Sequence, residues 1–223
     1  MTLLLALLSV ALLRHAGSAH SAGTTTRPAI RPVATGSTSA PATGVPTSVA
    51  TAAPSTLMPT TTTAPATMPV PGPVSAVGDS ILLDLQSELQ SAIPGVKVDG
   101  LVSRQFETGI GIVEADRADG TLGNVLLVEL GANGTVTSSD VDAMMQAASG
   151  VQRVVFVNVN VPRMWAAPDN AVLAAGVARF PGVAVLADWN ALSTGHPEWF
   201  TPDGVHLQPA GAQAMATLIA RYA

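Results

Sequence analysis

The sequence contains no cysteine, few charged residues and few aromatic residues. Without cysteine the chain can form neither a disulfide nor a catalytic thiolate, although this leaves its compartment open. Charged residues make up 11% of the chain and the net charge is −5, so the sequence lacks the basic face that a nucleic-acid partner requires. We therefore expect no nucleic-acid binding and no thiol chemistry.

The chain also lacks an apolar run long enough to cross a bilayer, which takes roughly 20 residues. The run at the start, "MTLLLALLSVALL", is shorter and is followed by Arg14. Two interpretations of residues 1–20 stay open. They are a signal peptide cleaved near "AGSAHSA", although without the usual basic start, or the remnant of a membrane anchor. Both predict an extracytoplasmic location, secreted or anchored at the cell envelope.

Residues 21–73 are rich in Thr, Ala, Pro, Ser and Gly, and Arg27 and Arg31 are the only charged residues among them. Such a segment buries too little apolar surface to offset the entropy lost on ordering. We expect a disordered tether here. The folded domain is then expected at 74–223.

Short apolar segments alternate with helical patterns after Pro73. Strands are expected at 74–77, 96–98, 124–130, 153–161 and 183–188. Helices are expected at "SILLDLQSEL", "SSDVDAMMQAASG", "DNAVLAAGVARF" and "PAGAQAMATLIARYA". Nearly all-apolar strands that alternate with helices predict an α/β fold, a three-layer sandwich around a five-stranded parallel sheet.

Polar and glycine-rich residues follow the predicted strands, where ligands bind in open α/β sheets. They are Gly78-Asp79-Ser80, Ser103-Arg104-Gln105, Gly131-Ala132-Asn133-Gly134, Asn160 with Arg163, and Asp188. The sequence therefore places a candidate site at the carboxyl edge of the sheet.

Ser80 stands at the turn from the first strand into a helix. Free backbone N–H groups and the helix dipole at that position stabilise a developing negative charge. A serine at a helix start is commonly only a cap, and Asp79 is an equal candidate for that cap.

The segment "LGANG" follows the third strand. Gly131 allows close approach of the backbone, and the Asn133 side-chain amide can donate to an oxyanion. Asn-Gly is also a common turn dipeptide, so a simple turn is the alternative.

Asp203 and His206 lie three residues apart before the last helix. A histidine can take and return a proton near neutral pH, and a carboxylate on its other nitrogen fixes its tautomer. The alternative is an Asp-Gly turn with a solvated histidine. His196 is a competing base, with Glu198 as its only nearby acid.

Taken together, "GDS" with Ser80, "GAN" with Asn133 and "DGVH" with Asp203 and His206 resemble the blocks of the SGNH (GDSL-type) hydrolase family over residues 74–223. The resemblance implies a flavodoxin-like fold. It also implies Ser80 as nucleophile, His206 and Asp203 as its base pair, and an oxyanion hole of Ser80, Asn133 and Gly131. The family's second block usually supplies a glycine N–H, whereas this sequence has "LVSRQF" there.

The segments "VSRQ", "VNVNVPRMW" and "WFTPDGVHLQPAGA" are similar to the extracytoplasmic SGNH domains of membrane acyltransferase-three proteins, including peptidoglycan O-acetyltransferases. The resemblance implies an esterase or O-acyltransferase for short acyl esters of surface glycans, with a membrane acyltransferase bundle as a possible partner and no cofactor. We expect Arg104, Gln105 and Trp199 to contact substrate.

Two further functions stay open from the sequence. One is a non-catalytic wall-binding or structural module, which the missing second-block glycine favours. The other is a metal hydrolase that uses Asp203, His206 and Asp188. The sequence has no His-x-x-x-His or clustered carboxylate pattern to support a metal site, so we expect none.

Overall fold

A computed structural model describes residues 69–223, so the predicted leader and nearly all of the predicted tether lie outside it. The strands are β1 (Val74–Gly78), β2 (Lys97–Gly100), β3 (Val125–Glu129), β4 (Arg153–Val157) and β5 (Ala184–Ala187). They pair in the order β2-β1-β3-β4-β5, and every pair is parallel. The predicted five-stranded parallel sheet is confirmed.

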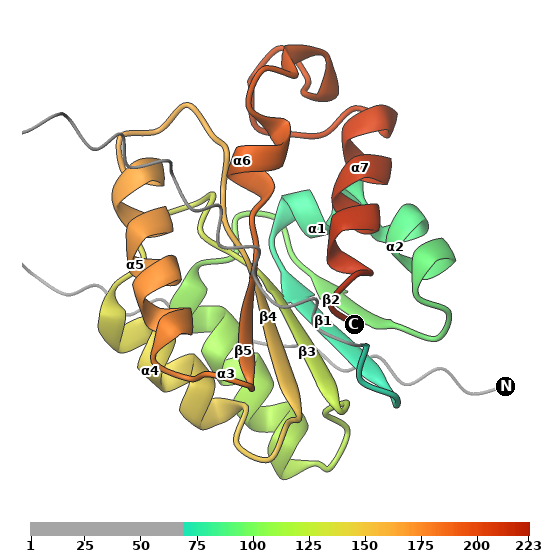
Figure 1. Ribbon diagram of the computed structural model, residues 1–223, viewed down its shortest axis with the longest axis vertical. Helices are drawn as coiled ribbons and strands as arrows, with labels where there is room; N and C mark the ends of the chain where they lie inside the picture. The colour runs from blue at the N-terminus through green and yellow to red at the C-terminus, as the bar shows by residue number, and fades with distance from the viewer. Residues whose placement is uncertain (1–68) are drawn as a thin grey trace, which may run out of the picture. The chain divides into compact units, whose positions relative to one another are not determined.

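Helices cover both faces of this sheet (Figure 1). They are α1 (Ser80–Asp84), α2 (Gln86–Ala92), α3 (Phe106–Ala118), α4 (Ser138–Ala147), α5 (Ala166–Ala178), α6 (Trp189–Ser193), the 3-10 helix η1 (Pro197–Trp199) and α7 (Pro209–Ile219). Helices α3, α4 and α5 lie on one face, and α1, α2 and α7 lie on the other. None of these helices is long and apolar enough to cross a membrane. The predicted three-layer sandwich is confirmed.

Two apolar cores result, because successive side chains of a strand point to opposite faces of the sheet. Leu127 in β3 packs into the core beneath α2 and α7, whereas its neighbour Leu126 packs into the core beneath α3 and α4. Both side chains are almost fully buried. Burying one leucine contributes roughly 1.5–3 kcal/mol, so the two cores hold the layers together.

Helix α3 was not predicted, because two glycines inside it, Gly109 and Gly111, weaken the helical pattern. Gly109 in α3 lies directly against the sheet, where an added Cβ would collide with Leu130. Gly111 faces open space. The close contact with Leu130 thus requires glycine at position 109. The same glycine weakens the helical pattern in the sequence.

Strand β4 is shorter than the predicted 153–161 and ends at Val157. Beyond it the Asn170 side chain bonds both the N–H and the carbonyl of Val159, at 3.0 and 2.8 Å. These bonds replace a neighbouring strand, so the chain can leave the sheet and form the loop toward α5.

The order of the strands decides which loops meet at the carboxyl edge. Strands β1 and β3 are neighbours at the centre of the sheet, with Gly78 opposite Glu129. The residues after Gly78 and those after Glu129 therefore emerge side by side, and they include Ser80 and Asn133.

Candidate active site

Ser80 is the first residue of α1, immediately after the tight turn from β1. Asp79 caps this helix, because its Oδ1 accepts a hydrogen bond from the Ile81 N–H at 2.9 Å. Of the two candidate caps that the sequence offered, Asp79 is the one used. The Ser80 hydroxyl is thereby left for another partner.

That partner is His206, whose Nε2 lies 3.1 Å from Ser80 Oγ. The other ring nitrogen, Nδ1, lies 2.7 Å from Asp203 Oδ2. The three predicted residues form one continuous chain of hydrogen bonds, although 126 residues separate Ser80 from His206 in sequence. Such a chain can move a proton from a hydroxyl to an imidazole.

The second oxygen of Asp203 fixes the orientation of its carboxylate. Asp203 Oδ1 accepts hydrogen bonds from Thr201 Oγ1 at 2.6 Å, from the Val205 N–H at 2.8 Å and from the His206 N–H at 3.1 Å. These three donors leave only Oδ2 facing the imidazole. The turn is also tied to α1, because the Leu207 N–H donates to Asp84 at 2.9 Å.

The hydrogen bond between Asp203 and His206 lowers the pKa of the Asp203 carboxyl and raises the pKa of the His206 imidazole. The hydrogen bond from His206, supported by those from Thr201 and Val205, holds the pKa of the Asp203 carboxyl well below its usual range. The hydrogen bond to Asp203 is also the main cause that raises the pKa of His206 above 6.5, against the opposing effect of partial burial. The imidazole is therefore a stronger base than a free histidine.

Asn133 supplies an unused donor beside Ser80. No well-formed hydrogen bond satisfies the buried Asn133 Nδ2 among residues 69–223, although the Asn133 side chain interacts with Asp79 and lowers the pKa of that carboxyl. The Asn133 backbone carbonyl accepts a 2.9 Å bond from Gln105 Nε2, which holds the loop in place. A buried N–H donor without a partner is unfavourable, and a ligand oxygen would satisfy it.

A cavity of about 230 Å³ contains these groups. Its lining residues are Ser80, Ala132, Asn133, Arg163, Trp165, Asp203, Val205 and His206. Gly131 is not among the lining residues, and its φ of 125° is a conformation that favours glycine. Its carbonyl accepts a 3.2 Å bond from Trp165 Nε1, so the loops after β3 and β4 are joined.

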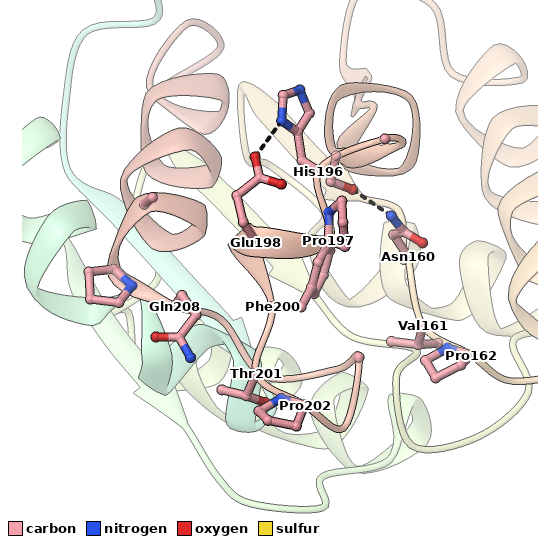
Figure 2. Close-up of a pocket in the computed structure, with 15 residues that line it drawn as sticks. Asn160, Val161, Pro162, His196, Pro197, Glu198, Phe200, Thr201, Pro202 and Gln208 are labelled. Atoms are coloured by element: carbon pink, nitrogen blue, oxygen red, sulfur yellow. Dashed lines mark hydrogen bonds and ion pairs between the residues drawn. The ribbon is translucent and has the colours of Figure 1, made fainter.

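A larger cavity, of about 990 Å³, adjoins the same turn but does not contain Ser80 (Figure 2). Thr201, Pro202 and Gly204 line it, whereas Asp203, Val205 and His206 line the smaller cavity. The reacting groups all belong to the smaller cavity, which is the candidate active site.

His196, the competing base, lies in the larger cavity and is paired with Glu198 at 2.9 Å (Figure 2). Its ring also stacks on Trp199, with centroids 4.0 Å apart. The structure therefore brings His206 to Ser80, and places His196 elsewhere.

The three predicted substrate contacts do not line the cavity that holds Ser80. Arg104 is buried and donates to the carbonyls of Gly78 and Asp99 and to the Asp99 carboxylate. Gln105 supports the Asn133 loop, and Trp199 stacks on Trp189 at 5.8 Å. The structure thus shows all three in supporting contacts, and a contact with substrate stays a prediction.

Arg163 and Trp165 line the cavity but were not among the predicted site residues. Both belong to "VPRMW", which follows β4, and Arg163 was already placed at the carboxyl edge. Their position directly after a central strand was the available signal. Side-chain direction in a loop cannot be inferred from that position alone.

Ser103 has φ of 62° and is the only non-glycine residue with positive φ among residues 69–223. It stands in "LVSRQF", where the SGNH pattern usually has glycine. The left-handed conformation costs a non-glycine residue about 1–2 kcal/mol, and strain of this kind tends to occur at functional sites. The backbone therefore keeps the shape that glycine would favour.

Two buried acids lie beneath Ser80. Burial raises the pKa of the Asp79 carboxyl, and the hydrogen bond from the Ile81 N–H partly opposes this. Burial also raises the pKa of Glu129 well above its usual 4.5, and the nearby charge of Asp79 raises it further. Glu129, at 2% exposure, thus keeps its proton to a higher pH than an exposed glutamate does.

No group of three or more His, Asp or Glu side chains within residues 69–223 is arranged to hold a metal ion. Asp188 caps α6 by accepting from the Ala191 N–H at 3.0 Å, and it also accepts from Asn158 at 2.7 Å. It is thus engaged away from Asp203 and His206.

No family model matches the sequence. The chain is 36% identical over 146 residues to a Bacillus subtilis protein provisionally named peptidoglycan O-acetyltransferase YrhL. It is 35% identical over 144 residues to peptidoglycan O-acetyltransferase OatA of Listeria monocytogenes. These matches cover 66% and 65% of this chain but only 23% of each relative. The chain spans less than a quarter of the length of these relatives.

Two solved structures share the fold. The C-terminal catalytic domain of Streptococcus pneumoniae peptidoglycan O-acetyltransferase A, which holds a methylsulfonyl adduct, has a TM-score of 0.60 and 24% identity, over 66% of this chain and 89% of that one. A provisionally named SGNH hydrolase from Slackia heliotrinireducens has a TM-score of 0.55 and 16% identity, over 69% and 97%. The described part of the chain has the fold of the SGNH (GDSL-type) hydrolases and is similar in sequence to one part of peptidoglycan O-acetyltransferases.

Proposed function

We propose that this domain is a serine-dependent esterase or O-acyltransferase for acetyl and other short acyl esters of cell-wall or surface glycans. The main support is the continuous hydrogen-bonded chain from Ser80 through His206 to Asp203, beside an Asn133 amide that makes no well-formed hydrogen bond within residues 69–223. This combination provides a nucleophile, its base and an oxyanion donor in one cavity.

The first half of the reaction forms an acyl-enzyme. Ser80 Oγ attacks the acyl carbonyl carbon while His206 Nε2 takes the hydroxyl proton, and the carbonyl oxygen becomes an oxyanion. Asn133 Nδ2 and the Ser80 backbone N–H donate to that oxygen. The C–O bond to the carrier alcohol then breaks, and His206 returns the proton to the departing oxygen.

The second half transfers the acyl group to an acceptor. Water or a sugar hydroxyl gives its proton to His206 and attacks the acyl carbon, and Ser80 recovers its proton as the new product leaves. Water gives a free acid, and a sugar hydroxyl gives an acylated sugar. The names of the curated relatives favour transfer to a glycan.

The same similarity suggests a location and a partner. A domain that acts on cell-wall glycans works outside the cytoplasm, in agreement with the interpretations of residues 1–20. An acyl donor supplied from the membrane, by a separate acyltransferase bundle, would deliver the acetyl group to Ser80. Both statements rest on the sequence similarity.

Replacing the nucleophile tests the proposal directly. The Ser80→Ala variant should lose turnover of 4-nitrophenyl acetate by at least about 10³-fold, because triad members act as a unit. A fluorophosphonate probe should label the wild type at Ser80 and leave the variant unlabelled. Substantial remaining turnover, with labelling elsewhere, would contradict the assignment.

The chain provides a matched control for the base. Both His206 and His196 are partly exposed and pair with an acid through Nδ1, at 2.7 and 2.9 Å. Only His206 touches Ser80. The His206→Ala variant should be inactive, and the His196→Ala variant should keep nearly full turnover. Equal losses of turnover in the two variants would contradict the assignment of His206 as the base.

Product analysis separates the possible outcomes. Mass spectrometry after incubation with an activated acetyl ester and a wall oligosaccharide detects either free acetate or an acetylated sugar. Free acetate alone identifies an esterase, and acetylated sugar identifies a transferase. Neither product, together with no probe labelling, would favour the non-catalytic binding module.

A further inference from the structure

Among residues 69–223, Arg163 is the one arginine or lysine that lines the candidate active-site cavity. Its side chain is exposed, and within residues 69–223 this side chain makes one hydrogen bond, from Nη1 to the Pro162 carbonyl at 3.2 Å. Within residues 69–223, no carboxylate forms an ion pair with it. A guanidinium has five N–H donors, so most of those on Arg163 are left for other partners.

The backbone around Arg163 is fixed on both sides. On one side Pro162 packs against Gly204 in the turn that holds His206, where an added Cβ would lie 3.3 Å from Pro162 Cγ. On the other side Trp165 bonds the Gly131 carbonyl. Arg163 thus lies on a segment that contacts both the turn that carries His206 and the loop that carries Gly131.

Asp203 is the only carboxylate that lines the same cavity, and it is not available to Arg163. Its two oxygens already take part in four hydrogen bonds, to His206 Nδ1, Thr201 Oγ1 and two backbone N–H groups. The positive charge that shares this cavity with the nucleophile therefore has no ion-pair partner within residues 69–223. A ligand that enters the cavity can supply one.

Resting on the proposed function, we propose that Arg163 determines specificity by binding a carboxylate on the carrier or acceptor of the acyl group. The substrate class is then an acyl ester, or an acceptor sugar, that bears a carboxylate close to the reacting oxygen. Arginine suits this role because its planar fork matches a carboxylate with two parallel hydrogen bonds. The carboxylate would lie at the mouth of the cavity, beside the bond that breaks.

Two isosteric esters test this proposal. The substrates are 4-acetoxybenzoate, which carries a carboxylate, and 4-acetoxybenzamide, which is neutral. In the Arg163→Ala variant kcat/KM for the benzoate should fall by about 10- to 100-fold, as expected for a lost charged hydrogen bond, and should change little for the benzamide. The loss should appear mainly in KM, because the carboxylate contact is the same in the bound substrate and the transition state.

Further variants separate charge, geometry and global effects. Arg163→Lys should recover only part of the preference, since an ammonium cannot form the paired fork. Arg221→Ala, which removes another exposed arginine beyond α7, should leave the benzoate-to-benzamide ratio unchanged. Equal losses on both esters in Arg163→Ala, or an unchanged ratio, would overturn the proposal. A preference for 4-acetoxyphenyl phosphate over the benzoate would replace the carboxylate with a phosphate and also overturn it.

Binding measurements keep this proposal separate from the proposed function. Benzoate and benzamide are titrated into the Ser80→Ala protein and followed by NMR shifts of the Trp165 indole N–H. Benzoate should bind at least about tenfold more tightly, and replacing Arg163 in the same protein should remove the difference. Absent turnover with this preference intact would refute the proposed function alone, whereas equal binding of both compounds would refute the role of Arg163.

Discussion

Replacing Asp203 with asparagine should trap His206 in the wrong tautomer. The three donors to Asp203 Oδ1 come from Thr201, Val205 and His206 itself, and two of them are backbone N–H groups that cannot move away. An asparagine must therefore place its carbonyl oxygen at that position. Its NH₂ group then faces His206 Nδ1.

The consequence follows from proton placement. When an NH₂ donor faces Nδ1, that nitrogen has to accept, so the neutral imidazole carries its proton on Nε2. Nε2 is the atom 3.1 Å from Ser80 Oγ, and once protonated it cannot take the hydroxyl proton. A loss of about 10⁴-fold in kcat is the magnitude known for this change in a Ser–His–Asp site.

The assay combines turnover with a direct view of the tautomer. Steady-state hydrolysis of 4-nitrophenyl acetate measures kcat, and the ¹⁵N shifts of the His206 ring show which nitrogen is protonated. Thr201→Val is the control, because it removes one donor to Oδ1 but keeps the contact between Asp203 and His206, and it should cost less than tenfold. A kcat for Asp203→Asn within tenfold of the wild type, or a ring still protonated at Nδ1, would refute the reasoning.

Four further predictions concern His206 and the groups near it. Because Asp203 raises the pKa of His206, kcat/KM should rise with pH through a midpoint above 6.5, and the Asp203→Asn midpoint should lie lower; identical profiles would contradict this. The same raised pKa contributes stability that is complete below pH 6.5 and is lost as the pH rises through the folded-state value, which urea unfolding at pH 6 and 9 measures. Asn133→Ala should reduce kcat by about 10²–10³-fold and change the melting temperature little, because its buried Nδ2 makes no well-formed hydrogen bond and interacts only with Asp79; a large drop in melting temperature would assign it a structural role. For Glu129, the raised pKa means that the free energy of unfolding of the wild type should fall relative to Glu129→Gln as the pH rises above 4.5, with convergence near pH 4; parallel curves from pH 4 to 8 would show that the buried carboxyl ionises normally.

Much of this protein could be predicted from the sequence. Continuous apolar segments such as "NVLLVEL" occur where a strand is buried on both faces, so the parallel sheet follows from composition alone. The carboxyl edge of such a sheet collects the loops, and this by itself predicts that Ser80 and Asn133 lie at the same edge. A spacing of three residues in a turn likewise allows Asp203 and His206 to face the same way, although the turn alone left a solvated histidine as the alternative.

Helix α3 and the environment of Arg104 could not be predicted. The glycine at position 109 weakens a helical pattern, and only its contact with Leu130 across the sheet shows why it is there. Arg104 follows a strand in the same way as Arg163 does. The fold buries the first against Asp99 and leaves the second at the cavity, and no local pattern distinguishes them.

The sequence by itself determined the class of fold, the edge where the site lies and the residue types that can perform the chemistry, because periodicity and turn preference are local properties of the chain. Only the tertiary structure decided that His206 and not His196 meets Ser80, that Asp79 caps α1, and that Arg163 borders the cavity. Each of these outcomes depends on a distance between segments far apart in sequence. Such distances are set by how the layers pack, which no single segment encodes.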